Sequence, residues 1–122
     1  MEVELVAPDR MIWSGEADMV IARTTDGDIG ILPGHEPTMG VLVEHPVRIR
    51  RTDEDELVAA VHGGFLAVTR DRVSILAEVV ELADEIDTGR ARNALEESGD
   101  DDEDKAAARR AKARLRAAGE SV

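Results

Sequence analysis

The chain has 122 residues, of which 43% are hydrophobic, so it can form one domain or a small domain with an appendage, and it is too short for a multidomain enzyme. Its 27 acidic residues outnumber its 15 basic residues, and the net charge of −12 excludes nucleic-acid binding and favours a basic protein partner. The lack of cysteine excludes a thiolate zinc site. The chain has no apolar run of about 18 residues and starts with acidic residues at Met1–Glu4, so we expect a cytosolic chain without direct membrane insertion.

Apolar and polar residues alternate in short runs from residue 3 to residue 77, as in Val47–Ile49 and Val73–Ile75. This period of two is typical of strands with one buried face. Turn-forming sequences recur at intervals of roughly 8 to 12 residues, which favours an all-β sandwich or barrel. These sequences are Ala7-Pro8-Asp9, Ser14-Gly15, Thr25-Asp26-Gly27, Leu32-Pro33-Gly34, His45-Pro46, Gly63-Gly64 and Thr69–Arg72. We expect a hairpin at Asp26-Gly27 and a strand that ends before Pro33.

The pattern becomes helical after an acidic connector at residues 78–85. Asp87 is placed to cap the first helix, which would end at Gly99, and a second helix would run from about Asp104 to Gly119. Both helices are short and poor in large apolar residues, with Leu95 and Leu115 as their main anchors. Helices of this length are marginal in water, so they must pack against another part of the protein.

The string Gly27–His35, GDIGILPGH, is the sharpest local motif. It lacks the third glycine and the following helix that a phosphate-binding loop needs, so nucleotide binding there is rejected. A small β-sandwich metal-dependent enzyme that uses His35 and carboxylates is an alternative, although Pro37 occupies the place of the expected second histidine. On local pattern alone the string is a tight turn.

This string resembles the G-[DE]-[ILF]-G-[IV]-[LY]-P-x-H signature of the epsilon subunits of bacterial F-type ATP synthases. The resemblance extends to Asp9–Gly15, Gly63–Phe65 and Val73–Ala77 in the expected order, and covers essentially the whole chain. It implies a mainly β plus α fold: an N-terminal antiparallel β-sandwich of two small sheets over residues 1–84, which docks on the rotor, and a C-terminal regulatory two-helix hairpin over residues 85–122.

The resemblance also implies a non-catalytic subunit of the central stalk, at the cytoplasmic face of the plasma membrane, which couples the gamma subunit and the c ring during proton-driven ATP synthesis. Asp28 and His35 match the loop positions that approach the c ring in relatives. A carboxylate and a neutral imidazole there would make polar contacts with c-ring loops. Gly63 and Gly64 are interpreted as structural, at a bend or a close approach of strands.

The sequence Ile86–Ala91 resembles the I/L-D-x-x-R-A motif by which some bacterial epsilon subunits bind ATP, and Arg110–Leu115 matches the R-A-x-x-R-L stretch of their second helix. The resemblance implies a regulatory ATP site, and no other cofactor or metal. Its residues would be Ile86, Asp87, Arg90, Ala91, Arg110 and Arg114. Glu97 departs from the pattern, because ATP-binding relatives place an arginine there, and the acidic run nearby repels a triphosphate.

Charge is segregated along the tail, since residues 78–104 carry 12 acidic residues and residues 105–118 carry six basic and no acidic residues. Two such helices attract each other, or the basic helix seeks an acidic partner. By the resemblance, the helices either fold on the sandwich or extend along gamma, where they meet acidic segments of the alpha and beta catalytic subunits and oppose ATP hydrolysis. A marginal hairpin suits such a two-state element.

Overall fold

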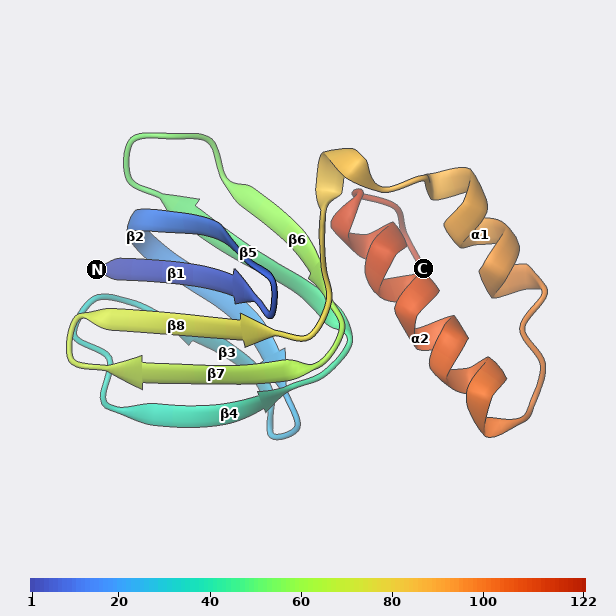
Figure 1. The fold of residues 1–122 in the computed structure, drawn as a ribbon, viewed down its shortest axis with the longest axis horizontal. Helices are drawn as coiled ribbons and strands as arrows, with labels where there is room; N and C mark the ends of the chain where they lie inside the picture. The colour runs from blue at the N-terminus through green and yellow to red at the C-terminus, as the bar shows by residue number, and fades with distance from the viewer.

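The alternating segments form eight β-strands, and a ninth forms within the predicted connector; the computed structural model, which describes all of residues 1–122, places a pair of helices beside them (Figure 1). The strands are β1 (Glu2–Ala7), β2 (Arg10–Thr24), β3 (Gly27–Ile31), β4 (Thr38–Leu42), β5 (His45–Arg51), β6 (Leu57–Val61), β7 (Gly64–Thr69), β8 (Arg72–Ala77) and β9 (Val80–Leu82). Strand β3 ends two residues before Pro33, as predicted, and Gly27 closes the β2–β3 hairpin with a φ of 116°.

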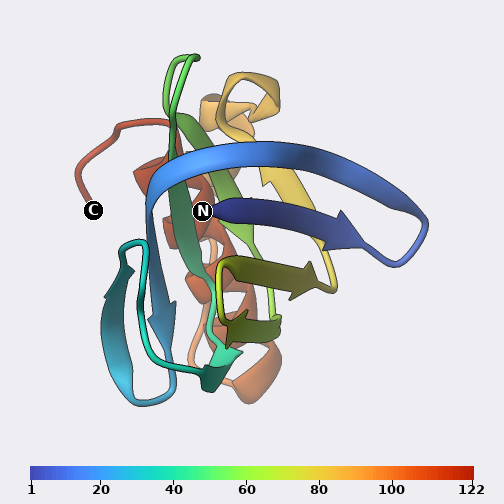
Figure 2. The same ribbon diagram turned by 90° about the vertical axis from the view of Figure 1, so that its left-hand side faces the viewer.

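The strands form two packed layers that share the 15-residue strand β2. The hydrogen-bonded order is β1-β8-β7-β4-β2-β5-β6-β9, with β3 and β1 also paired to β2. Figure 2 shows β2 curving from its pairing with β1 over to the layer that contains β3 and β5. The predicted sandwich is confirmed. Its pairings are antiparallel with one exception, because β1 and β8 run parallel.

The core lies between the two layers, because in strands such as β1, β7 and β8 every second side chain points inward. In β1, for example, Val3 and Leu5 have no exposed surface while Glu2 is exposed. The buried cluster consists of Val3, Leu5, Ala17, Val20, Ala22, Ile31, Leu42, Val47, Ile49, Ala59, Val61, Leu66, Val68, Val73, Ile75 and Ala77. A core of this size gives the sandwich a stiff body.

The glycine pair after β6 allows a close approach of strands. Gly64 has a φ of 129°, and a Cβ atom there would overlap the carbonyl oxygen of Leu76 and lie 2.8 Å from the Cα of Ala77. Only glycine combines this backbone conformation with this proximity. The structure therefore assigns Gly64 the structural role that the sequence suggested.

Helix α1 (Thr88–Glu96) follows a short 3₁₀ turn, η1 (Ala83–Glu85), and is shorter than predicted. Its start is as expected, because the Asp87 side chain accepts a hydrogen bond of 3.0 Å from the Arg90 amide. The expected stop at Gly99 is wrong. The Ser98 hydroxyl donates to the Leu95 carbonyl at 2.7 Å, so this carbonyl of the last helical turn has a partner and the helix ends before Gly99.

Helix α2 (Asp102–Ala117) begins two residues earlier than predicted, with Asp101 as its cap. The Asp101 side chain accepts from the Asp104 amide at 2.8 Å. Four aspartates stand among the five acidic residues at positions 100–104, and each can cap a helix, so the sequence leaves open which one does. The stop near Gly119 is confirmed: Gly119 has a φ of 88°, and the Glu120 amide donates to the Leu115 carbonyl at 2.8 Å.

Helix α2 lies between the sandwich and α1 (Figure 1). It packs on β5 and β6, while α1 packs on α2. Small side chains make much of this contact, since Ala113 and Ala117 pack against Ala60, with Val58 and Ile86 beside them. The hairpin is therefore attached to the sandwich through one helix.

Candidate functional site

A cavity of about 440 Å³ lies between α1, α2 and the connector from the sandwich. Four residues of the predicted ATP site line it together, namely Asp87, Arg90, Ala91 and Arg114. They come from the first turn of α1 and the last turn of α2, which the hairpin brings side by side. The structure thus brings together most of the residues that the two sequence motifs suggested.

Two residues of the predicted ATP site lie outside this cavity. Ile86 packs against the small-residue contact between α2 and β6 instead of offering its side chain to the cavity. The Arg110 guanidinium pairs with Glu103 at 3.2 Å on the same helix. Glu81 and Glu85 line the cavity and were not expected there, because the sequence places both in the acidic connector, where the structure instead forms the short strand β9 around Glu81.

Acidic and basic groups are mixed in the cavity, whose lining includes three carboxylates and two guanidiniums. Arg114 Nε donates to Glu81 Oε1 at 2.6 Å, so this arginine is already paired. Burial opposes ionisation of Glu81, but the hydrogen bond and charge of Arg114, helped by His62, hold its pKa below the ordinary value. Arg90 makes no ion pair and is the cationic group of the cavity that remains available to an anion.

His62 joins this cluster from the sandwich side. Its Nε2 lies 2.9 Å from Glu81 Oε1, and its Nδ1 is buried without a hydrogen-bond partner. Burial lowers the pKa of His62 more than the hydrogen bond to Glu81 raises it, and the positive charge of Arg114 lowers it further. His62 is therefore neutral near pH 7 and binds Glu81 through its Nε2 hydrogen.

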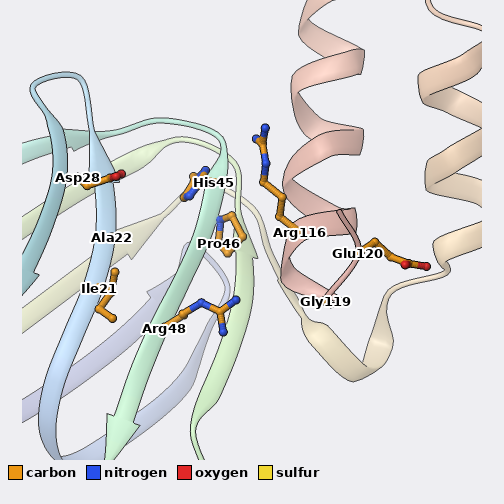
Figure 3. A pocket seen from close by; sticks show the side chains of 9 residues that line it. All are labelled: Ile21, Ala22, Asp28, His45, Pro46, Arg48, Arg116, Gly119 and Glu120. Atoms are coloured by element: carbon orange, nitrogen blue, oxygen red, sulfur yellow. The ribbon is translucent and has the colours of Figure 1, made fainter. Parts of the chain in front are cut away.

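Asp28, a predicted contact to the c ring, lies near the start of β3 with an exposed side chain. Arg23 Nε donates to it at 2.6 Å, and this hydrogen bond holds the pKa of Asp28 below its ordinary value. Asp28 also lines a cavity of about 420 Å³ between the sandwich and the end of α2, opposite His45 and Arg116 (Figure 3).

His35, the second predicted contact, lies beyond the other end of β3 in the segment that leads to β4. Its Nδ1 lies 2.8 Å from the Glu36 carbonyl oxygen and so carries the hydrogen that it donates. Asp28 and His35 thus sit at opposite ends of β3 and do not form one site. No group of three or more histidine, aspartate or glutamate side chains is placed to hold a metal, so the alternative of a metal-dependent enzyme finds no ligand set in this fold.

An apolar row crosses the outer face of the layer formed by β4, β7, β8 and β1. Its members are Val41, Phe65, Leu76 and Val6, each the register partner of the next. Val41 is 46% exposed, Phe65 53% and Leu76 46%, and Val6 is half-buried. Met39, on the same strand as Val41, is 76% exposed. This row could not be seen in the sequence, because its members come from four separate segments of the chain.

A family model described as the ATP synthase delta/epsilon chain, β-sandwich domain, matches residues 1–83. The chain is 57% identical over 117 residues to the ATP synthase epsilon chain of Streptomyces griseus, covering 96% of this chain and 94% of that one. The chain belongs to the epsilon-chain family of ATP synthases. It is also 54% identical over 123 residues to the epsilon chain of Thermobifida fusca, covering 95% of this chain and 90% of that one.

The fold also matches chains in solved structures of ATP synthases. The fold matches a chain of the Euglena gracilis mitochondrial ATP synthase, in a structure of OSCP, F1 and the c ring, with a TM-score of 0.84 and 25% identity. That match covers 95% of this chain and 79% of the other. A chain of the Tetrahymena thermophila central stalk and c ring shows the same fold with a TM-score of 0.64 at 22% identity, covering 95% of this chain and 91% of the other.

Family membership makes this chain a central-stalk subunit of an F-type ATP synthase and not a catalytic one. The predicted family is therefore confirmed, along with the stalk role. Neither helix has the length and apolar character needed to cross a membrane.

Proposed function

We propose that the sandwich of this epsilon chain couples the gamma subunit to the c ring, and that its helical hairpin, once released from the sandwich, opposes ATP hydrolysis. In this proposal the complex lies at the cytoplasmic face of the plasma membrane. The observation that supports the proposal best is the contrast between the two parts: a large buried core in the sandwich, and a hairpin attached mainly through alanines. The first part transmits torque and the second can change position.

The apolar row is the proposed docking face for gamma. Exposed apolar side chains in register across several strands mark a surface that a partner covers. Its Val41 is 46% exposed, and Val79, outside the row, is 50% exposed, so the two valines form a matched pair. Val41→Glu should abolish co-purification with gamma, while Val79→Glu should leave it intact. Equal binding by both variants would remove the proposed face.

Asp28 and His35 are the proposed contacts to polar loops of the c ring. Because they lie at opposite ends of β3, each would meet a different point of the ring. The chain has no cysteine, so a single cysteine can be placed at either position without background reaction. Disulfide cross-linking of Asp28→Cys or His35→Cys to cysteines in c-ring loops should succeed, whereas Glu97→Cys, at the exposed position that follows α1, should not react. Failure at both positions would refute this contact.

The basic residues of α2 are the proposed regulatory groups. In the folded hairpin Arg109 lies 3.8 Å from Glu44 and Arg114 lies 2.6 Å from Glu81, so the acidic residues of the sandwich neutralise them. A released α2 would offer the same arginines to acidic segments of the alpha and beta catalytic subunits. The pair of Glu44 with the exposed Arg109 contributes only about 0 to 1 kcal/mol. In the half-buried Arg114–Glu81 pair the cost of desolvation offsets part of the attraction, so the exchange of partners is nearly balanced.

An ATPase assay tests this regulation. The purified chain, added to a catalytic complex that lacks epsilon, should slow ATP hydrolysis. The same chain truncated after Asp87 should still bind the complex and should no longer slow hydrolysis. Inhibition that is unchanged by the truncation would contradict a regulatory hairpin.

The cavity between α1 and α2 is the proposed site of regulatory ATP, with Arg90 as the available phosphate ligand and Asp87 as a carboxylate acceptor. Three carboxylates in the lining oppose a triphosphate, so we expect weak binding. Calorimetry with ATP should give a heat signal that Arg90→Ala removes. Arg92→Ala is the matched control, since Arg92 is on the same helix, lies outside the cavity, and faces Glu120 at 3.9 Å. Binding that survives Arg90→Ala would discard the site.

A further inference from the structure

One carboxylate oxygen joins three elements of the fold. Glu81 Oε1, on β9, accepts from His62 Nε2 at 2.9 Å and from Arg114 Nε at 2.6 Å. His62 follows β6 and its side chain is 4% exposed, while Arg114 belongs to α2. We propose that a proton on His62 and helix α2 compete for the carboxylate of Glu81, so that protonation of His62 releases α2 from the sandwich. This proposal deepens the regulation proposed above and rests on it for its physiological meaning.

While α2 is docked, the hydrogen-bonding pattern around His62 disfavours a second proton on its ring. A carboxylate only accepts, so the neutral ring carries its hydrogen on Nε2 and has a bare lone pair on Nδ1. Protonation would place a hydrogen on Nδ1, which is buried and has no acceptor within reach. A buried donor without a partner is strongly disfavoured.

The charges around His62 act in the same direction. Glu81 carries one negative charge, which Arg114 already balances while α2 is docked. When α2 leaves, Arg114 leaves with it, and the same carboxylate is free to pair with a protonated His62. Other titratable groups on the elements around His62 include Glu44 before β5, whose negative charge favours the charged ring, His45 on β5, Glu78 beside Gly63, and the exposed Asp84 and Glu85 of η1. Strand β5 also carries Arg48, Arg50 and Arg51, and α2 carries further basic residues, among them Arg109, which lies 3.8 Å from Glu44.

The sign of the pH effect follows from these two states. In the docked state burial and Arg114 hold the pKa of His62 below its ordinary value. In the released state Arg114 is gone and Glu81 favours the charged ring, so the pKa of His62 rises towards the ordinary value of a histidine. Docking is therefore unaffected by pH well above the range in which histidine titrates. As the pH falls into the interval between the released-state and docked-state pKa values, the released population grows by up to about tenfold per pH unit.

Native-state hydrogen exchange on the isolated full chain measures this release. After correction for the intrinsic exchange rate, the amides of the buried α2 residues Ala111 and Ala113 should lose protection as the pH is lowered from 7.5 to 5.5, by at most about tenfold per pH unit. The amide of Ile75 in the sandwich should keep its protection. Equal loss at Ile75 would mean general acid destabilisation and would overturn the proposal.

Two histidine variants separate His62 from the rest of the molecule. His62→Gln can still donate to Glu81 but does not titrate, so its α2 protection should no longer depend on pH in this range. His45→Gln is the control, because His45 faces Arg116 of α2 but makes no hydrogen bond to a carboxylate. A pH dependence that survives in His62→Gln, or that disappears in His45→Gln instead, refutes the competition for Glu81. The hydrogen-exchange results for both variants do not depend on the ATPase assay. The competition for Glu81 and the proposed inhibition of ATP hydrolysis can therefore be refuted separately.

Discussion

Leu115 is the only large side chain of the two helices that is completely buried, so Leu115→Ala tests how the hairpin is held. The change removes three carbon atoms, worth roughly 2.4 kcal/mol of transfer free energy, and the cavity left behind brings the expected loss to about 3 kcal/mol. A free-energy loss of about 3 kcal/mol raises the population of released hairpin on the order of 100-fold. Because the core of the sandwich does not include Leu115, the strands should remain folded.

Hydrogen exchange distinguishes the two parts of the molecule. In Leu115→Ala the amides of α2 should lose protection on the order of 100-fold, while the amides of β7 and β8 should exchange as in the natural chain. Leu32→Ala is the matched control, since Leu32 is 56% exposed and its replacement should change stability by less than about 0.5 kcal/mol. If α2 keeps its protection, or if the strands lose theirs to the same extent, the hairpin is not an independently released unit.

Three further variants test the local arguments. Gly64→Ala should lower the free energy of unfolding of the sandwich by more than about 3 kcal/mol in urea denaturation, because its Cβ would overlap the Leu76 carbonyl. Asp101→Ala should cost α2 about 1 kcal/mol, measured by hydrogen exchange, because the amide that the aspartate caps loses its acceptor. The pKa of Glu81 is lowered in the folded chain, so its contribution is complete above pH 4.5 and is lost as the pH falls through the lowered value. Glu81→Gln should therefore reduce the fall in urea midpoint between pH 5 and pH 3.

Each of these variants has an outcome that contradicts its argument. A Gly64→Ala chain as stable as the natural one would mean that β7 and β8 approach less closely than they do here. Unchanged α2 exchange in Asp101→Ala would show that a neighbouring acidic residue takes over as cap. An identical acid response with and without Glu81→Gln would assign that response to other carboxylates.

The strands could be predicted because their signal is local. Alternation with a period of two, and turn residues such as Pro33 and Gly27, depend only on near neighbours and on the φ angles that those residues accept. Helix ends were less certain. Asp87 was identified because it directly precedes a helical pattern, whereas Asp101 is one of four nearby aspartates that can each act as a cap.

Four of the residues that line the proposed ATP cavity were recognisable from two short motifs. Asp87, Arg90 and Ala91 lie at the start of α1 and so form one local pattern, and Arg114 belongs to the second motif, on α2. Glu81 was not recognised, since only the path of the chain brings β9 under α2 and His62 beside both. Interactions between residues far apart in sequence produce no local sequence pattern, so they cannot be recognised from any short segment of the chain.

The sequence by itself determined the sandwich, the two helices and the family, because these depend on repeated local patterns and on short motifs that follow one another in order along the chain. The tertiary structure decided where the helices rest, that Arg114 is held by Glu81, and that Val41, Phe65 and Leu76 line up on an exposed face. The physical reason is that packing and charge pairing act between residues that are tens of positions apart in the sequence. These interactions stabilise one arrangement only after the chain has folded and brought the residues together.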